Sequence, residues 1–382
     1  MKKILIFSTF YSPAYKGGGP IKSVKGLSKI LSDKNEIFIF CMNHDIDGSL
    51  LDIPASDKWL EIDGVNVYYS SKEKLIKNLF MVLRLKFDYV YLNSFFSLHF
   101  SIIPMVIIKF FSTTKNIVLA PRGEFSPGAL ALKSKKKEKY LLLANLISLY
   151  GEDITWHATS NLEEKEISLV LKKYLKFNNF RIKVAQNISP VSDSRRIKVV
   201  EKKQIDLVFL SRISPKKNLK YALEVLSKCS SLINFDIWGP LEDQQYWEEC
   251  EKLIVSLPFN ITVNYKGSIE PTEVPRLLSE YDLFFFPTLG ENYGHVIAES
   301  LSVGTPLLIS NKTPWENLDH FGVGRDIDLK NMMNFVEFLE DFNCKNIQEK
   351  TLMRQRALEY FDEKFCGENV VNATYSLFKS EI

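Results

Sequence analysis

The amino-acid sequence predicts an α/β protein with two domains, each built on a parallel β-sheet. Short apolar segments of strand length alternate with segments of helical period along nearly the whole chain, which is the pattern of βαβ units. A chain of 382 residues is too long for one ordinary core. A polar segment without periodicity, residues 186–204, divides the alternation into two series. We interpret it as the linker between the domains.

Seven apolar segments of the first series are predicted strands, and each ends near a loop that could face a ligand. They are Ile4–Ser8, Ile37–Met42, Val65–Tyr69, Tyr89–Leu92, Ile117–Ala120, Thr155–Ala158 and Ile182–Val184. Two helix starts can be recognised between them. The glycines at 17–19 precede Pro20, which suits the first turn of a helix. Ser160 followed by Glu163 forms a capping box that opens a helix to about Tyr174.

The second series predicts five further strands before a helical end of the chain. These strands are Asp206–Ser211, Phe235–Trp238, Ile261–Lys266, Leu283–Phe286 and Pro306–Ile309. Beyond Leu329 the pattern is helical, including the segment "NVVNATYSLFKS". The first domain is therefore placed at residues 1–190 and the second at residues 191–365.

Composition indicates a globular protein of the cytoplasm. A net charge of +3, with 25% charged and 46% hydrophobic residues, gives no global argument for a nucleic-acid partner. The five cysteines are scattered and form no C-x-x-C pair, which favours reduced thiols over a zinc site or disulfides. Ile4–Thr9 is too short for a signal peptide. Phe95–Phe111 falls below the ~20 residues that span a bilayer, and we expect a buried helix there.

The most informative motif is "ENYGHVIAE", which directly follows the apolar run "YDLFFFPTLG". This order predicts a strand, a loop and a helix start. Glu291 lies in the loop, and Glu299 is expected about two turns into the helix. The backbone amides of Asn292, Tyr293 and Gly294 at the helix start favour an anion or a ring of hydroxyls. A sugar phosphate offers both groups.

A second motif, "FLSRISPKKN", places two cations after the first strand of the second series. Arg212 follows the strand, and Lys217 comes five positions later. Two fixed cations can neutralise the charge on a departing nucleoside diphosphate in place of a metal ion. The plainer interpretation is a solvated basic loop, because Lys216 and Lys220 lie nearby. The glutamate motif downstream favours the functional interpretation.

These segments resemble the retaining glycosyltransferases of family 4. "ENYGHVIAE" is similar to that family's two-glutamate motif, and "FLSRISPKKN" to its donor-diphosphate motif. "PAYKGGGP", "LAPRGEFSPGAL" and "VGTPLLIS" match further blocks, so the resemblance covers most of the chain. It implies the GT-B fold of two facing Rossmann-like domains. Residues 1–190 would bind the acceptor and residues 191–365 the nucleotide-sugar, while a final helix, 366–382, would cross back to the first domain.

The resemblance also implies roles for single residues. Glu299 matches the position whose carboxylate accepts both ribose hydroxyls of the nucleotide, and Glu291 matches the position that holds hydroxyls of the donor sugar. Gly18 and Gly19 would bring backbone amides close to a phosphate, although a mobile surface loop is the alternative. No carboxylate stands out as a nucleophile. The resemblance implies same-face attack assisted by the leaving diphosphate, and we expect no cofactor and no metal.

Three residues of the first domain are candidates for the acceptor side. Arg122 and Glu124, in "APRGEF", lie in the cleft by similarity, where Arg122 could meet a phosphate or an acceptor hydroxyl. An interdomain ion pair is equally consistent for both. Asn93 stands where many relatives carry a histidine near the reacting sugar, and an amide cannot act as a base. We interpret His157 as structural and His295 as a neighbour of the donor site.

A run of lysines precedes the apolar segment "YLLLANLISL". The run consists of Lys133, Lys135, Lys136, Lys137 and Lys139. Such runs usually form a solvated face. Beside an apolar helix on the acceptor domain, this one could also touch an anionic membrane surface or a lipid-linked diphosphate. Both interpretations stay open.

Together these features predict a cytoplasmic, retaining, metal-independent glycosyltransferase, peripheral on the inner face of the plasma membrane if the lysine run meets lipid. It would move a sugar from a UDP- or GDP-sugar to a glycan or polyprenyl-diphosphate-linked acceptor in bacterial surface polysaccharide assembly. The alternatives are a GT-B nucleotide-sugar epimerase, a phosphorylase, or a noncatalytic nucleotide-sugar-binding protein, for which Asn93 is the main support. The sequence does not specify the donor sugar, the base, the acceptor, the linkage or the oligomeric state.

Overall fold

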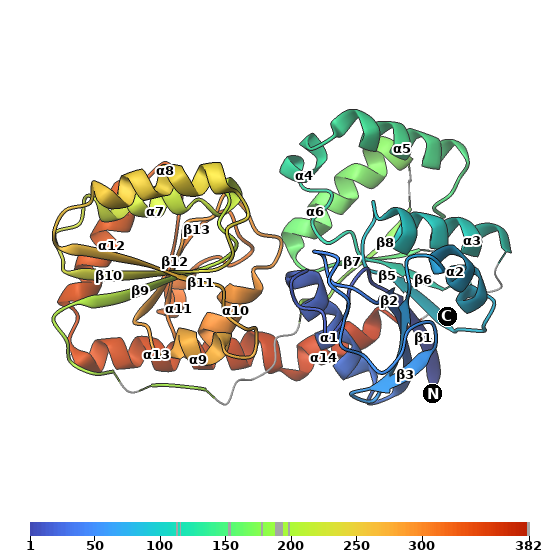
Figure 1. Cartoon of the computed structure of the whole chain (residues 1–382), viewed down its shortest axis with the longest axis horizontal. Helices are drawn as coiled ribbons and strands as arrows, with labels where there is room; N and C mark the ends of the chain where they lie inside the picture. The colour runs from blue at the N-terminus through green and yellow to red at the C-terminus, as the bar shows by residue number, and fades with distance from the viewer. Residues whose placement is uncertain are drawn as a thin grey trace. The chain divides into compact units, whose positions relative to one another are not determined.

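The structure, a computed structural model, consists of two compact units. It describes residues 1–111, 114, 116–151, 154–176, 179–187, 194–197 and 199–379. The first unit comprises Met1–Ile188 together with Gly367–Ile382, and the second comprises Ser189–Cys366. Each unit has a β-sheet with helices on both of its faces (Figure 1). The predicted linker at 186–204 lies partly outside the described residues.

The first unit contains an eight-stranded sheet in the order β3-β4-β2-β1-β5-β6-β7-β8. Its strands are β1 (Lys2–Phe7), β2 (Asn35–Met42), β3 (Trp59–Ile62), β4 (Val65–Ser70), β5 (Tyr89–Leu92), β6 (Ile117–Leu119), β7 (Thr155–Ala158) and β8 (Arg181–Val184). All neighbours are parallel except β3 and β4. The seven predicted strands are confirmed with small shifts at their ends. β3 was missed because it is a four-residue edge strand that carries a glutamate.

Both faces of this sheet are covered, which explains the continuous apolar character of its central strands. In β1, Leu5 and Phe7 face one core cluster, whereas Ile4 and Ile6 face the other. The helices of the unit are α1 (Gly19–Leu31), α2 (Leu75–Leu83), α3 (Ile103–Phe111), α4 (Pro127–Ala131), α5 (Ser134–Leu146), α6 (Asn161–Val170) and α14 (Glu368–Ser376), with π-helical turns η1 (Leu98–Ile102) and η2 (Leu171–Leu175). Residues of α2, α3, α5 and α6 pack on one face, and residues of α1 and the α14 end pack on the other.

Two helix predictions in this unit need correction. Phe95–Phe111 is not one buried helix: η1 and α3 share it, and Phe110 and Phe111 are exposed. An amphipathic helix on the surface needs only one apolar face to be covered. At the start of α6, the Ser160 side chain accepts from the Glu163 amide as predicted. The Glu163 carboxylate does not complete the capping box, since it accepts from Thr159 instead.

The second unit contains a six-stranded, fully parallel sheet in the order β11-β10-β9-β12-β13-β14. Its strands are β9 (Ile205–Leu210), β10 (Ile233–Trp238), β11 (Ile261–Gly267), β12 (Leu283–Phe286), β13 (Leu307–Ser310) and β14 (Gly324–Ile327). The five predicted strands are confirmed. The edge strand β14 was missed because "GRDI" has too few apolar residues to be recognised.

Helices cover both faces of the second sheet as well. They are η3 (Pro215–Lys217), a 3-10 turn, then α7 (Leu219–Leu226), α8 (Gln244–Val255), α9 (Val274–Ser279), α10 (His295–Ser302), α11 (Leu318–Phe321), α12 (Met332–Cys344), α13 (Ile347–Phe361) and the π-helical turn η4 (Asp362–Cys366). Figure 1 shows α7 and α8 on one side of the sheet and α9 and α13 on the other. One large core cluster spans the unit.

The C-terminal helix α14 belongs to the first unit, although it follows the whole second unit in sequence. Tyr375 donates from its hydroxyl to the carbonyl of Ile30 at 2.8 Å. The Lys2 ammonium donates to the carbonyl of Phe378 at 2.8 Å. These contacts tie the end of the chain to α1 and β1.

Candidate active site

The loops that follow β9 and β12 are joined at the carboxyl edge of the second sheet. β9 and β12 are parallel neighbours, so their carboxyl ends lie at the same edge, which is where ligands bind in open α/β sheets. The Lys216 carbonyl accepts from the amide of Leu289 at 2.9 Å and from the hydroxyl of Thr288 at 3.1 Å. These bonds bring the loop of Lys217 against the loop of Glu291.

Lys217 and Glu291 form an ion pair across these loops. Their side chains are only 13% and 14% exposed, so water and salt screen the pair weakly. The Thr288 hydroxyl oxygen lies 3.3 Å from the same carboxylate, and the Lys217 nitrogen lies 5.6 Å from the centre of the Phe286 ring. The structure therefore brings together two residues that the sequence placed in the site.

Arg212 has a different partner. It lies just after β9 and forms an ion pair with Glu242, with side chains 55% and 42% exposed. The two cations of the motif are therefore paired with different carboxylates, Arg212 with Glu242 and Lys217 with Glu291. Gly239, at a φ of 134°, lets the loop after β10 approach, because a Cβ there would lie 1.8 Å from the Ser211 carbonyl oxygen. The sequence analysis missed Glu242. Its only signal was the "WGP" turn directly after a predicted strand.

Glu299 lies in α10, but closer to the start of the helix than expected. The helix begins at His295 because Gly294 has a left-handed φ of 80°, so Glu299 is little more than one turn into the helix instead of two. A Cβ on Gly294 would lie 2.8 Å from a methyl carbon of Ile297, so a larger residue would have to displace that methyl group and would also be strained by the left-handed φ. Glu299 is half-buried.

The segment between the two glutamates is anchored by aromatic packing. The indole nitrogen of Trp315 donates to the carbonyl of Tyr293. The Tyr293 ring is buried, with its centre 5.7 Å from Trp315 and 6.3 Å from Phe365. The packing of the Tyr293 side chain therefore fixes the loop. Asn292 and Gly294 are the residues directly before and after Tyr293 in the chain.

In the first unit, Gly18 and Gly19 lie at the start of α1. Gly18 caps the helix with a φ of 71°, and Gly19 is its first residue. Asp45, which is buried, holds the loop before them: its carboxylate accepts from the amides of Tyr15 at 2.8 Å and Lys16 at 3.0 Å. The sequence analysis left Asp45 uninterpreted because its partners lie 29 and 30 positions away.

Arg122 is held by contacts within its own unit. Its guanidinium donates at 2.7 Å to each of three uncharged oxygens of its own unit: the side-chain oxygens of Asn93 and Asn187 and the hydroxyl of Tyr91. Glu124 likewise accepts hydrogen bonds from residues of its own unit. Its carboxylate accepts from the Ser94 hydroxyl at 2.8 Å.

A buried polar chain continues from Arg122 to His157, as expected for a structural histidine. His157 Nε2 lies 2.8 Å from the Ala185 carbonyl, so this nitrogen carries the proton. Nδ1 must then accept from the Tyr91 hydroxyl, also at 2.8 Å. Burial, helped by the positive charge of Arg122, lowers the pKa of His157 to about 3. Burial raises the pKa of Tyr91 to about 12, so both groups are neutral at physiological pH.

We expect His157 to make the protein sensitive to acid. It stays neutral when folded, whereas the unfolded chain takes up a proton below a pKa of 6.5, so stability falls as the pH drops through that value. From pH 7.5 to pH 5 the wild type should lose about 2 kcal/mol more of its unfolding free energy than His157→Gln. Glutamine keeps one donor and one acceptor but does not titrate. Urea unfolding at both pH values measures this difference, and equal losses in the two proteins would refute it.

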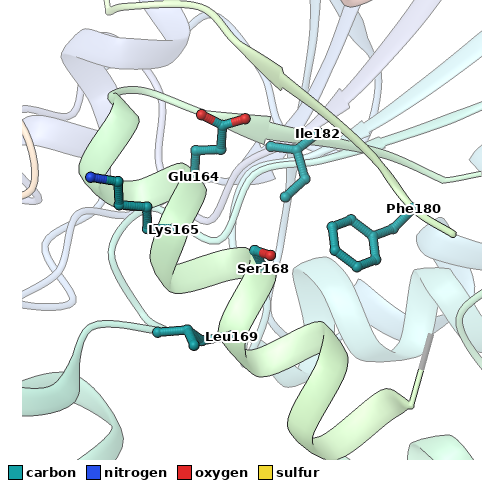
Figure 2. Close-up of a pocket in the computed structure, with 6 residues that line it drawn as sticks. All are labelled: Glu164, Lys165, Ser168, Leu169, Phe180 and Ile182. Carbon is teal, nitrogen blue, oxygen red and sulfur yellow. The ribbon is translucent and has the colours of Figure 1, made fainter. Parts of the chain in front are cut away.

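The structure also describes features outside the predicted site. Among the described residues no three His, Cys, Asp or Glu side chains are grouped to hold a metal ion, and metal independence stays a prediction. No described helix is both long and apolar enough to cross a bilayer. Figure 2 shows a hollow on the first unit that none of the sequence-predicted residues lines. It is lined by Glu164, Lys165, Ser168, Leu169, Phe180 and Ile182.

Comparisons with known proteins show what this chain is similar to. Residues 191–340 match the family model "Glycosyl transferases group 1". A protein of Klebsiella pneumoniae, "Uncharacterized 41.2 kDa protein in cps region", is 23% identical over 306 residues, 77% of this chain and 79% of that protein. Arg212, Lys217, Glu291 and Glu299 lie within the range that the family model matches.

Solved structures share the fold over the whole length. Anabaena Alr3699/HepE, in complex with UDP and glucose, matches with a TM-score of 0.68 and 16% identity, covering 99% of this chain and 98% of that one. WaaG, a glycosyltransferase involved in lipopolysaccharide biosynthesis, matches with a TM-score of 0.65 and 14% identity, covering 99% and 100%. Residues 191–340 of the second unit are therefore similar to the group 1 glycosyltransferases, and the chain has the GT-B architecture of two Rossmann-like units.

Proposed function

We propose that this chain is a retaining, metal-independent glycosyltransferase that moves a sugar from a nucleotide-sugar to a glycan or a lipid-linked acceptor in surface polysaccharide assembly. The observation that carries the proposal is the shielded Lys217–Glu291 pair at the carboxyl edge of the second sheet, within the residues that the family model matches. The Klebsiella relative from a cps region and the WaaG likeness support the pathway. The UDP and glucose in the Anabaena structure support the donor class.

In this proposal the residues of the second unit bind the donor. Glu299 accepts the ribose hydroxyls, and Glu291 holds hydroxyls of the sugar. Lys217 and Arg212 stabilise the charge that builds on the diphosphate as its bond to the anomeric carbon breaks. The acceptor hydroxyl attacks from the same face and gives its proton to the leaving phosphate oxygen. The new glycosidic bond therefore keeps the configuration of the donor.

A screen of donors tests the proposal and separates its rivals. Purified protein is first screened with UDP, GDP and their sugars by thermal shift, and then incubated with each stabilising donor and candidate acceptors. Mass spectrometry and NMR of the anomeric proton should show a glycoside with the configuration of the donor. A new sugar formed from the donor alone would indicate an epimerase, and turnover that needs phosphate and a glycan a phosphorylase. Binding without any product would indicate a noncatalytic protein.

Removal of divalent metal should leave transfer intact. Arg212 and Lys217 supply positive charge where a divalent ion would otherwise act. The initial rate in EDTA is therefore expected to equal the rate with added Mg²⁺ or Mn²⁺, measured as nucleoside diphosphate released. A rate that appears only on addition of metal would contradict this role of the two cations.

We also propose that α5 meets an anionic membrane surface. Lys133, Lys135, Lys136 and Lys139 are exposed around the first half of the helix. The second half exposes the leucines at 142, 143 and 146. Basic side chains that can attract anionic headgroups are therefore followed along the helix by apolar side chains that can contact lipid. Lys137 is half-buried and donates to the Ala129 carbonyl at 2.6 Å, so it does not belong to this surface.

Charge reversal on α5 should weaken binding to anionic vesicles. The triple variant Lys135→Glu, Lys136→Glu, Lys139→Glu removes attraction worth about 1 kcal/mol per lysine. Co-sedimentation with phosphatidylglycerol vesicles should fall by at least tenfold, while thermal shift by the nucleotide stays unchanged.

The matched control reverses three exposed lysines of the second unit, Lys203, Lys228 and Lys330. If the wild type and the α5 variant bound vesicles equally, or if the control variant lost as much binding as the α5 variant, the proposed membrane contact would be wrong. The lysine run would then be a solvated face of the protein.

A further inference from the structure

We propose that Arg122 and Glu124 are positioning residues, which fix the loop after β5 so that Asn93 presents only its amide hydrogens to an oxygen of the substrate. This inference rests on the proposed transferase function. It assigns to Arg122 an action through Asn93 instead of direct contact with a phosphate.

The orientation of the Asn93 amide follows from Arg122. The Arg122 Nε donates to the Asn93 side-chain oxygen at 2.7 Å. Because a guanidinium has donors and no acceptor, the atom facing it must be the oxygen. The nitrogen of the amide must then point the other way, and the usual ambiguity between the two atoms does not arise here.

The Asn93 amide nitrogen has no hydrogen-bond partner among the described residues. Asn93 is only 7% exposed, and its backbone amide donates to the Phe7 carbonyl at 3.1 Å. It directly follows β5, which lies between β1 and β6 in the sheet. This is the carboxyl edge, where ligands of parallel sheets bind, and a nearly buried N–H pair there favours an incoming acceptor atom.

Arg122 cannot easily turn towards a ligand itself. Its two terminal nitrogens also donate at 2.7 Å, Nη1 to the side-chain oxygen of Asn187 and Nη2 to the hydroxyl of Tyr91. Its backbone has a left-handed φ of 55°, and the next amide, of Gly123, donates to the buried carboxylate of Glu163 at 2.6 Å. A non-glycine residue persists in this conformation only where its surroundings hold it.

Glu124 fixes the rest of the same loop. Its carboxylate accepts from the Ser94 hydroxyl at 2.8 Å, from the Phe95 amide at 2.6 Å and from the Phe96 amide at 3.0 Å. Arg122 and Glu124 therefore hold four consecutive residues, 93–96, from one short segment. The loop can present a group accurately because it has little freedom to move.

The chemistry of the contact follows from this geometry. A donor-only amide recognises an oxygen with free lone pairs, such as a hydroxyl, carbonyl, carboxylate or phosphoryl oxygen. It cannot take a proton from an attacking hydroxyl. Asn93 therefore contributes to orientation of the sugar or the acceptor and not to base catalysis.

Asn93→Asp is the decisive variant, because it keeps the shape and the oxygen that faces Arg122 but removes the N–H donors. We expect kcat/KM for transfer to fall by about tenfold or more, with unchanged melting temperature and unchanged UDP binding. Arg122→Lys keeps the charge but cannot make all three bonds, and we expect a similar fall. The double variant should lose little more than either single variant, since both act on one contact.

Matched controls carry the same chemical changes on the surface. They are Asn334→Asp and Arg276→Lys, both at exposed positions, and both should leave transfer unchanged. Normal kcat/KM in Asn93→Asp, or losses that simply add in the double variant, would overturn the inference. Asn93→Asp decides the matter even if Arg122→Lys fails to fold. A wild type that binds UDP-sugar but transfers nothing would refute the proposed function itself, and this inference with it.

Discussion

Replacing Lys217 by alanine is expected to lower the transfer rate by about two to three powers of ten. The Lys217 side chain is 13% exposed and lies beside the Phe286 ring, so in the proposed reaction its charge would act on the leaving diphosphate with little screening. Arg212→Ala should cause a smaller loss because the Arg212 side chain is 55% exposed. If both act on the same charge, the double variant should lose less than the sum of the two single losses in free energy.

Steady-state transfer kinetics of the four proteins measure this, with folding checked by thermal melting. Lys216→Ala is the matched control: Lys216 lies in the same turn, its side chain is exposed, and its described contacts to Thr288 and Leu289 use the backbone carbonyl. Rates near that of the wild type in folded Lys217→Ala would overturn the donor-site assignment. Removal of Lys217 also leaves the Glu291 carboxylate without its cation, so part of the loss in Lys217→Ala would come from this uncompensated charge.

The largest effect on stability is expected from Arg354 in α13. Its side chain is almost fully buried and donates to three backbone carbonyls: Nε to Arg196 at 2.9 Å, and the terminal nitrogens to Tyr281 at 2.7 Å and Ser279 at 2.8 Å. Burial lowers its pKa to about 10, so it remains charged at neutral pH. Arg354→Ala leaves these carbonyls without their donor and creates a cavity, and should cost about 3–5 kcal/mol of unfolding free energy.

Urea unfolding followed by circular dichroism measures the loss. Arg356→Ala, two positions along the same helix, is the matched control because Arg356 is exposed, and its effect should stay within about 0.5 kcal/mol. Comparable stabilities of the two variants would show that the buried contacts of Arg354 contribute little.

Sequence patterns predicted most of the fold because each central strand of the two sheets is a continuous apolar run that can be recognised from a few neighbouring residues. Central strands such as β5 and β12 are continuous apolar runs, and the structure places them at the predicted residues, Tyr89–Leu92 and Leu283–Phe286. The loop positions of Lys217 and Glu291 followed from the strands that precede them. The edge strands β3 and β14 were missed, since an edge needs fewer apolar residues to form.

The partners of the site residues could not be predicted in the same way. Arg212 meets Glu242 across 30 positions, and the Gly123 amide meets Glu163 across 40. Nothing in the sequence near Arg122 or Arg354 indicates that their guanidinium groups donate hydrogen bonds to uncharged oxygens of the same unit. Such contacts depend on how strands and loops are ordered in space, which periodicity does not record.

The carboxylate partners of Lys217 and Arg212 have a consequence for ligand choice. Each cation already has a counter-charge, so the two pairs together offer little net attraction to a passing anion. An entering group must compete with Glu242 at the exposed pair and with Glu291 at the shielded one. A lone phosphate would replace a carboxylate as the partner of each cation and gain no further contacts. A diphosphate joined to a ribose and a sugar would make additional contacts through these groups. The site would then select among cellular anions by how well each one replaces the carboxylates as partner of the two cations, and not by a net positive charge that attracts every anion.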